Sequence, residues 1–165
     1  MRKTVIKTGL GYDDLKRAIQ DLKRYKQEFL DREKRLVEGL AAIGLKEATV
    51  RFTSAMYDGT NDVSVHLETT KNGYAIVAEG KVVAFIEFGA GVYHNGSGTY
   101  PNPLPQGIVG IGQYGDGHGK QKAWGYYDGN GNLVITRGNP AAMPMWYASE
   151  EIKNSVMTVV RQVFS

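Results

Sequence analysis

Apolar residues recur every seven positions through the first third of the chain. This spacing places them on one narrow face of an α-helix. The positions are Leu15, Leu22, Phe29, Leu36, Ile43 and Val50, with Ile19 and Leu40 at the intervening i+4 places and Lys26, Glu33 and Glu47 filling the others. We expect either two helices, from about residue 13 to about 25 and from about 29 to 55, or one continuous helix. Asp13 or Asp14 is the expected N-cap residue.

Two antiparallel hairpins are predicted farther along. Residues 63–69 alternate apolar and polar side chains, and residues 74–79 return after an Asn72-Gly73 pair that is typical of a hairpin turn. Residues 124–127 and 133–136 flank a second glycine-containing turn, Asp128-Gly129-Asn130-Gly131-Asn132. The second pattern is the most specific local signal in the chain.

The stretch Val82–Gly91, VVAFIEFGAG, joins the regular part of the chain to a long irregular one. Its apolar residues are consecutive, so periodicity does not separate helix from strand. The absence of Gly and Pro within residues 82–88 favours a short helix. Glu87 is a candidate catalytic acid, a buried ion-pair partner, or a carboxylate that faces another subunit.

The C-terminal segment predicts a helix that begins near Pro144, because proline is favoured in the first helical turn. Apolar residues then follow at spacings of three and four. Met143, Met145 and Trp146 are large apolar side chains at its start. They suit either the core or an adaptable interface.

Glycine defines the remaining segment, since 14 of the 21 glycines lie between Gly89 and Gly138. We expect a flexible Gly/Pro-rich insertion at about 91–123 within a single domain spanning residues 1–165. The fold class predicted is α+β, with N-terminal helices and a C-terminal helix packed on a small antiparallel β-sheet.

Composition narrows the possible chemistry. The chain has no cysteine, which excludes disulfides and thiol nucleophiles, and no apolar run approaches the ~20 residues that span a bilayer, so no membrane partner is expected. His94, His118 and Asp116 lie in a glycine-saturated loop without a metal-ligand spacing, so no metal site or cofactor is expected. Two alternatives stay open. One is a small hydrolase that uses Glu87 and loop residues, and the other is a nucleic-acid-binding module built on the basic N-terminal helix.

Two motifs carry a family resemblance. Ile86-Glu87-Phe88-Gly89-Ala90-Gly91 resembles a "(V/I)EFGTG" signature with Ala in place of Thr, and residues 136–145, TRGNPAAMPM, resemble "TRGNPAxPF(M/L)" with Met145 in place of the usual aromatic residue. In this order, after a charged helical half and a hairpin, they resemble the tail-completion and head–tail joining (neck) proteins of long-tailed bacteriophages and prophages.

That resemblance implies a structural virion protein without enzymatic activity. It implies that copies form a ring, expected to be a hexamer, which completes the tail and joins it to the head while DNA passes through the lumen. The implied partners are other copies, the tail-tube protein and the head connector proteins, and the isolated chain can still be monomeric. The implied location is the virion, and the bacterial host cytoplasm before assembly.

The interface is expected to place the second hairpin and the loop on one side of the subunit and a helical face on the other. Glu87 is expected to accept hydrogen bonds from a backbone turn or to pair with a cation such as Arg137. The candidate interface residues are Glu87, Phe88, Trp124, Tyr126, Arg137, Met143, Met145 and Trp146.

Overall fold

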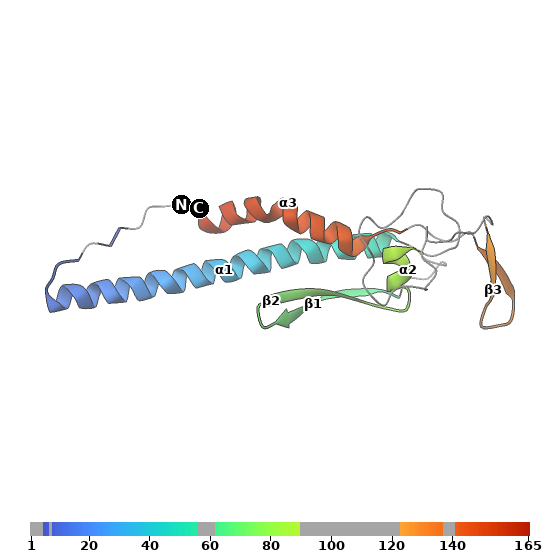
Figure 1. Cartoon of the computed structure of the whole chain (residues 1–165), viewed down its shortest axis with the longest axis horizontal. Helices are drawn as coiled ribbons and strands as arrows, with labels where there is room; N and C mark the ends of the chain where they lie inside the picture. The colour runs from blue at the N-terminus through green and yellow to red at the C-terminus, as the bar shows by residue number, and fades with distance from the viewer. Residues whose placement is uncertain (1–4, 7, 56–61, 90–122, 137–140) are drawn as a thin grey trace.

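The structure is a computed structural model that describes residues 5–6, 8–55, 62–89, 123–136 and 141–165. Three helices and two hairpins are arranged along an elongated molecule (Figure 1). The elements are α1 (Tyr12–Ser54), β1 (Ser64–Thr70), β2 (Gly73–Glu79), α2 (Val83–Phe88), β3 (Trp124–Tyr127), β4 (Leu133–Thr136) and α3 (Pro144–Phe164). The α+β class is confirmed, and so is the short helix predicted over residues 82–88.

α1 is one unbroken helix of 43 residues, so the continuous alternative is the correct one. The expected aspartate cap is wrong: Gly11 is the N-cap residue and no side chain caps the helix. Asp13 and Asp14 lie instead in the first turn, where negative charge still interacts favourably with the helix dipole.

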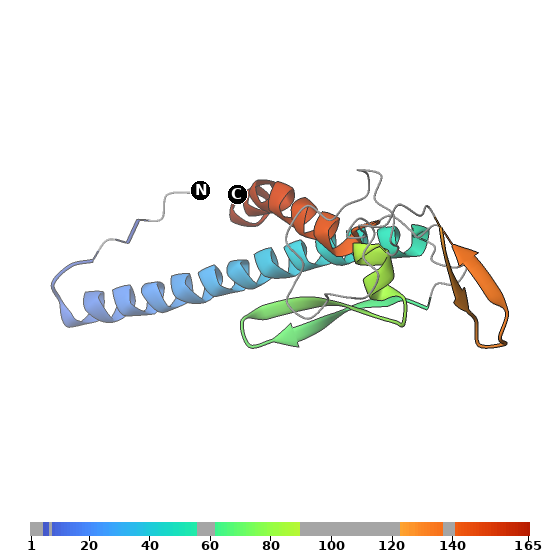
Figure 2. The ribbon, with the colours of Figure 1, turned by 45° about the vertical axis from the view of Figure 1, so that its right-hand side comes forward.

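α1 lies between α3 on one side and the β1–β2 hairpin on the other (Figures 1 and 2). Gly44 marks the closest approach of the three layers, because a Cβ added there would lie closer than 3.0 Å to side-chain atoms of both Ile152 in α3 and Ile76 in β2. The helix therefore has a glycine in its interior where neighbours on two sides need the space.

The core lies near the C-terminal end of α1. It is centred on Ala48, Phe52, Ile86 and Ala148, which come from α1, α2 and α3. Partly buried residues of both hairpin strands, including Val65 and Ile76, pack against this cluster. Burying these apolar side chains joins the three helices and the first hairpin into one body.

Both predicted hairpins form, as two separate two-stranded antiparallel sheets. β1 pairs with β2 from Ser64↔Glu79 to Thr70↔Gly73, and β3 pairs with β4 from Trp124↔Thr136 to Tyr127↔Leu133. The first turn consists of Lys71 and Asn72. The expected flexible insertion at 91–123 lies almost wholly outside the described residues.

Candidate assembly interface

Glu87 caps the start of α3 from another element. Its Oε2 accepts a hydrogen bond of 2.8 Å from the backbone N–H of Met145, and its Oε1 accepts one of 3.1 Å from that of Trp146. The side chain is 4% exposed. The prediction that Glu87 accepts hydrogen bonds from the backbone is therefore confirmed.

The sequence at the start of α3 explains why an outside carboxylate is needed. The N-cap residue, Met143, adopts a left-handed backbone (φ 54°, ψ 45°) and has no oxygen in its side chain with which to cap the helix. Pro144 follows at the first turn and has no N–H. Met145 and Trp146 thus have the first free N–H groups of the helix, and the N-terminal end of the helix dipole favours a negative charge beside them.

A third hydrogen bond joins the same two segments. The backbone N–H of Ala142 donates to the carbonyl oxygen of Ile86 at 2.9 Å. The two motifs that carry the family resemblance are consequently in direct contact, although 58 residues separate Glu87 from Met145. Because both oxygens of Glu87 accept backbone N–H groups in a buried position, the carboxylate is poorly placed to act as the acid of a hydrolase.

The predicted interface residues around α3 divide between core and surface. Met145 packs against the buried core, while Phe88, Met143 and Trp146 are partly buried. The Trp146 ring meets the Tyr147 ring edge-on with centroids 4.9 Å apart. Arg51 of α1 lies 3.8 Å from the centroid of the Tyr147 ring, in a cation–π contact.

The β3–β4 hairpin extends from the end of the molecule opposite the start of α1 (Figures 1 and 2). Tyr127, Leu133 and Ile135 are exposed on it by 74%, 57% and 64%. They share one face, because Tyr127 pairs with Leu133 and Gly125 with Ile135. Such exposed neighbouring apolar residues are typical of an interaction surface.

The sequence predicted other residues of this hairpin, Trp124 and Tyr126, as interface residues. Trp124 and Tyr126 lie in β3, but their side chains are outside the described part, and so is the whole of Arg137. Leu133 and Ile135 were missed as interface candidates. The signal that could have found them is their spacing of two residues within a predicted strand, which places both side chains on one face.

The tip of this hairpin is held by Asp128. Its carboxylate accepts hydrogen bonds from the backbone N–H groups of Asn132 (2.8 Å) and Asn130 (2.9 Å) and from the side-chain amide of Asn132 (3.2 Å). These bonds, that from the Asn132 backbone most of all, lower the pKa of Asp128 below its ordinary value of 3.8. Gly131 adopts a positive φ of 79°, as the turn requires.

The described ranges contain no group of three His, Cys, Asp or Glu residues that could hold a metal ion. His94, His118 and Asp116 lie outside those ranges. Among α1, α2 and α3, no helix is both long and apolar enough to cross a membrane.

The arrangement supplies a packed helical body, an exposed apolar hairpin at one end, and a buried carboxylate that fixes the start of α3. Comparison of the chain with protein-family models, curated proteins and solved structures gives no match.

Proposed function

We propose that this protein is a structural subunit of the neck of a long-tailed bacteriophage or prophage. Copies of the chain form a ring, with six as the expected number, that completes the tail and joins it to the head. The ring binds the tail-tube protein on one side and the head connector proteins on the other, and DNA passes through its lumen. The protein is synthesised in the host cytoplasm and ends in the virion.

The observation that carries the proposal is the contact between the two resembling motifs. Three hydrogen bonds join Ile86 and Glu87 to residues 142–146. The two motifs are far apart in the sequence but bind each other in the fold. This contact explains why they would occur together in one family, and it supports the family resemblance.

The shape of the subunit also supports a ring. A cyclic ring uses two different surfaces of each subunit, because each copy binds its two neighbours head to tail. The β3–β4 hairpin offers one such surface, with strand edges that pair with no other described strand and with exposed apolar side chains. The helical faces at the other end of the molecule offer the second.

The test is deletion of the gene from the phage or prophage that encodes this chain. Filled heads and complete tails should accumulate separately in lysates, and electron microscopy should show few joined particles. Supplying the wild-type chain from a plasmid should restore joining. Normal infectious particles from the deletion strain would contradict the proposal.

A further inference from the structure

The N-terminal half of α1 carries an apolar stripe, most of which lies beside no other helix or strand of the described residues (Figures 1 and 2). Each of its residues is exposed by between 43% and 54%. We define the α1 stripe as Leu15, Ile19, Leu22, Tyr25, Phe29 and Leu30. Single exposed apolar residues are common on soluble proteins, whereas a contiguous set on one helix face marks an interaction site.

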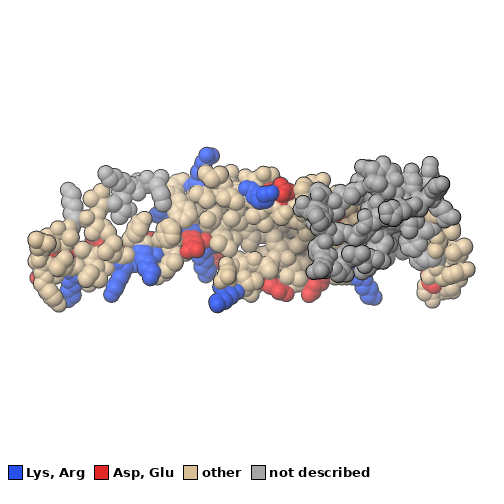
Figure 3. Space-filling model, in the orientation of Figure 1, with Lys and Arg blue, Asp and Glu red and all other residues tan. Residues whose placement is uncertain are grey.

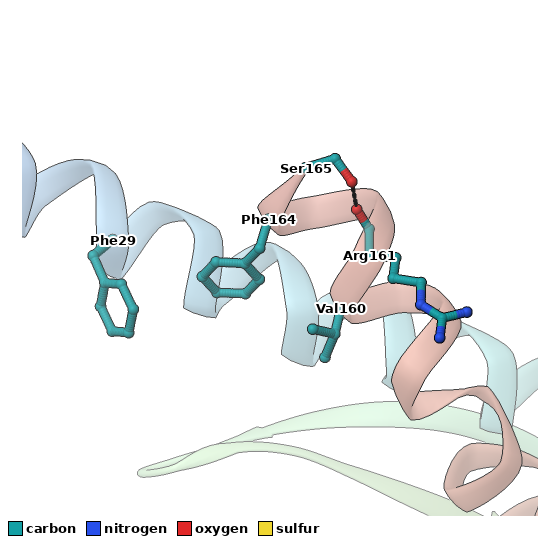
Figure 4. Close-up of a pocket in the computed structure, with 5 residues that line it drawn as sticks. All are labelled: Phe29, Val160, Arg161, Phe164 and Ser165. Atoms are coloured by element: carbon teal, nitrogen blue, oxygen red, sulfur yellow. Dashed lines mark hydrogen bonds between the residues drawn. The ribbon is translucent and has the colours of Figure 1, made fainter. Parts of the chain in front are cut away.

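The stripe begins where α3 ends. α3 covers the same face of α1 as far as Phe29, whose ring lies 5.8 Å from that of Phe164 between centroids. An apolar pocket of about 410 Å³ opens there, lined by Phe29, Val160 and Phe164 together with Arg161 and Ser165 (Figure 4).

Beyond this pocket α1 continues for about 25 Å, at 1.5 Å per residue, without another described helix or strand beside it (Figures 1 and 2). Helical segments in proteins gain most of their stability from packing of an amphipathic face. Packing against α3 therefore stabilises α1 from Phe29 onward, whereas the described elements give the turns before Phe29 no such packing.

Charge differs between the two flanks of the stripe. A helical period places Asp14, Asp21 and Glu28 on one flank and Lys16 and Lys23 on the other, with Lys26 inside the stripe. Asp14 and Asp21 pair within the helix with Arg17 and Arg24 at 2.8 Å, but these pairs are exposed and contribute little. In the view of Figure 3, basic side chains line the lower edge of this half of the molecule.

This asymmetry selects one way of packing the helix against a copy of itself. When two such helices run parallel with their stripes facing, the acidic flank of one meets the basic flank of the other. When they run antiparallel, acid faces acid and base faces base. The seven-residue spacing of Leu15, Leu22 and Phe29 suits parallel pairing, since it keeps the apolar seam facing the partner.

We propose that the α1 stripe binds the α1 stripe of a second copy of this chain, in parallel. The inference adds to the ring-forming role proposed above a contact through which copies associate in pairs. Two stripes that face each other in parallel are related by a two-fold axis along the helices, so this contact uses the same surface on both copies and differs from the head-to-tail contacts that close the ring.

The primary test measures the mass of the purified full chain by analytical ultracentrifugation over a range of concentrations. Wild-type protein should associate, and Leu22→Glu should weaken association at least tenfold. Gln20→Glu is the matched control, because it adds the same charge on the exposed opposite face of the same helix. Circular dichroism should show that Gln20→Glu keeps the helix content of the wild type and that Leu22→Glu loses at most the helical signal of the residues before Phe29.

A charge exchange tests whether the charged flanks guide the pairing. Lys16→Glu with Lys23→Glu makes both flanks of the stripe acidic, and Asp21→Lys with Glu28→Lys makes the acidic flank mainly basic. Each double variant should be monomeric alone, and an equimolar mixture should associate again. Double variants that each associate like wild type would overturn pairing guided by these flanks, from which the parallel direction is argued.

Two other occupants of the α1 stripe would give different results in these binding measurements. A wild-type chain that stays monomeric but associates once residues 1–11 are removed would assign the stripe to its own N-terminal segment and overturn the inference. Binding of monomeric wild-type protein to anionic phospholipid vesicles would do the same. A Leu22→Glu chain that still associates like wild type overturns this inference alone, whereas normal head–tail joining after gene deletion overturns the proposed function.

Discussion

The carboxylate of Glu87 lies 2.8 Å from the backbone nitrogen of Met145 and joins α2 to the first turn of α3. The N-cap residue of α3, Met143, has no side-chain oxygen that could accept hydrogen bonds from the free N–H groups of the helix. Glu87, which is distant in the sequence, provides that acceptor. Glu87 therefore has a structural role at the junction of the two motifs.

Replacement of Glu87 should destabilise the fold in a graded way. Glu87→Ala leaves two buried N–H groups without this acceptor and should lower the free energy of unfolding by about 2–4 kcal/mol. Glu87→Gln keeps one acceptor oxygen and should cost about 1–2 kcal/mol. Urea denaturation followed by circular dichroism measures both values.

Glu79→Gln provides the control for this series, because Glu79 is exposed at the end of β2 and should change stability by less than about 0.5 kcal/mol. If Glu87→Ala were as stable as wild type, the capping role would be wrong.

Gly44→Ala should destabilise the protein although alanine is the better helix former. The added Cβ would overlap the side chains of Ile152 and Ile76, and overpacking of this kind costs about 1–3 kcal/mol. Gly39→Ala is the matched comparison, because its Cβ would meet only Val159, at 3.1 Å. Differential scanning calorimetry should give a lower Tm for Gly44→Ala than for Gly39→Ala, and the reverse order would contradict the close approach described at Gly44.

Ile135→Glu should leave the isolated subunit folded but impair assembly. Ile135 is 64% exposed, so the substitution should change subunit stability by less than about 0.5 kcal/mol. In the proposed role it places a charge on the apolar face of the β3–β4 hairpin, and complementation of the deletion phage should fail. Gly129→Glu adds the same charge at the hairpin tip, where an added Cβ would have no atom within 4 Å beyond those of the adjacent residues, and should complement normally.

Acid should loosen the β3–β4 turn through Asp128. Hydrogen bonds from Asn132 lower the pKa of Asp128 in the folded chain below its ordinary 3.8. The carboxylate therefore stabilises the turn above the ordinary pKa, and this contribution is lost as the pH falls through the lowered value. NMR titration of the Asp128 carboxyl carbon and the Asn132 amide should show both signals changing together below pH 3.8; in Asp128→Asn the Asn132 amide should not respond.

Alkali should act on the contact between β2 and α1. The Tyr74 hydroxyl donates to Glu38 Oε1 at 3.1 Å, and this bond raises the pKa of Tyr74 above 10.0. The raised pKa means that the contact stabilises the fold below pH 10.0 and that its contribution is lost as the pH rises through the raised value. Ultraviolet titration should find the pKa of Tyr74 closer to 10.0 in Glu38→Gln, and an unchanged pKa in that variant would contradict the assignment.

The sequence by itself determined the local elements. A seven-residue apolar period, two glycine-containing turn patterns and a proline at a helix start each depend on the geometry of a few adjacent residues, and the helices and hairpins they predicted all form. For Glu87 the sequence also supported the prediction of backbone hydrogen bonds or a cation as partner, without identifying which backbone groups it would meet.

Only the tertiary structure decided which distant residues meet. The acceptor role of Glu87 depends on the position of α3, and the need for glycine at position 44 of α1 arises from the close approach of Ile76 and Ile152. The exposed α1 stripe has the same apolar period as the buried part of the helix, and the end of α3, where Phe164 contacts Phe29, marks where the covered part begins. Periodicity reports which face of a helix is apolar, whereas the packing of the whole chain decides how much of that face is covered.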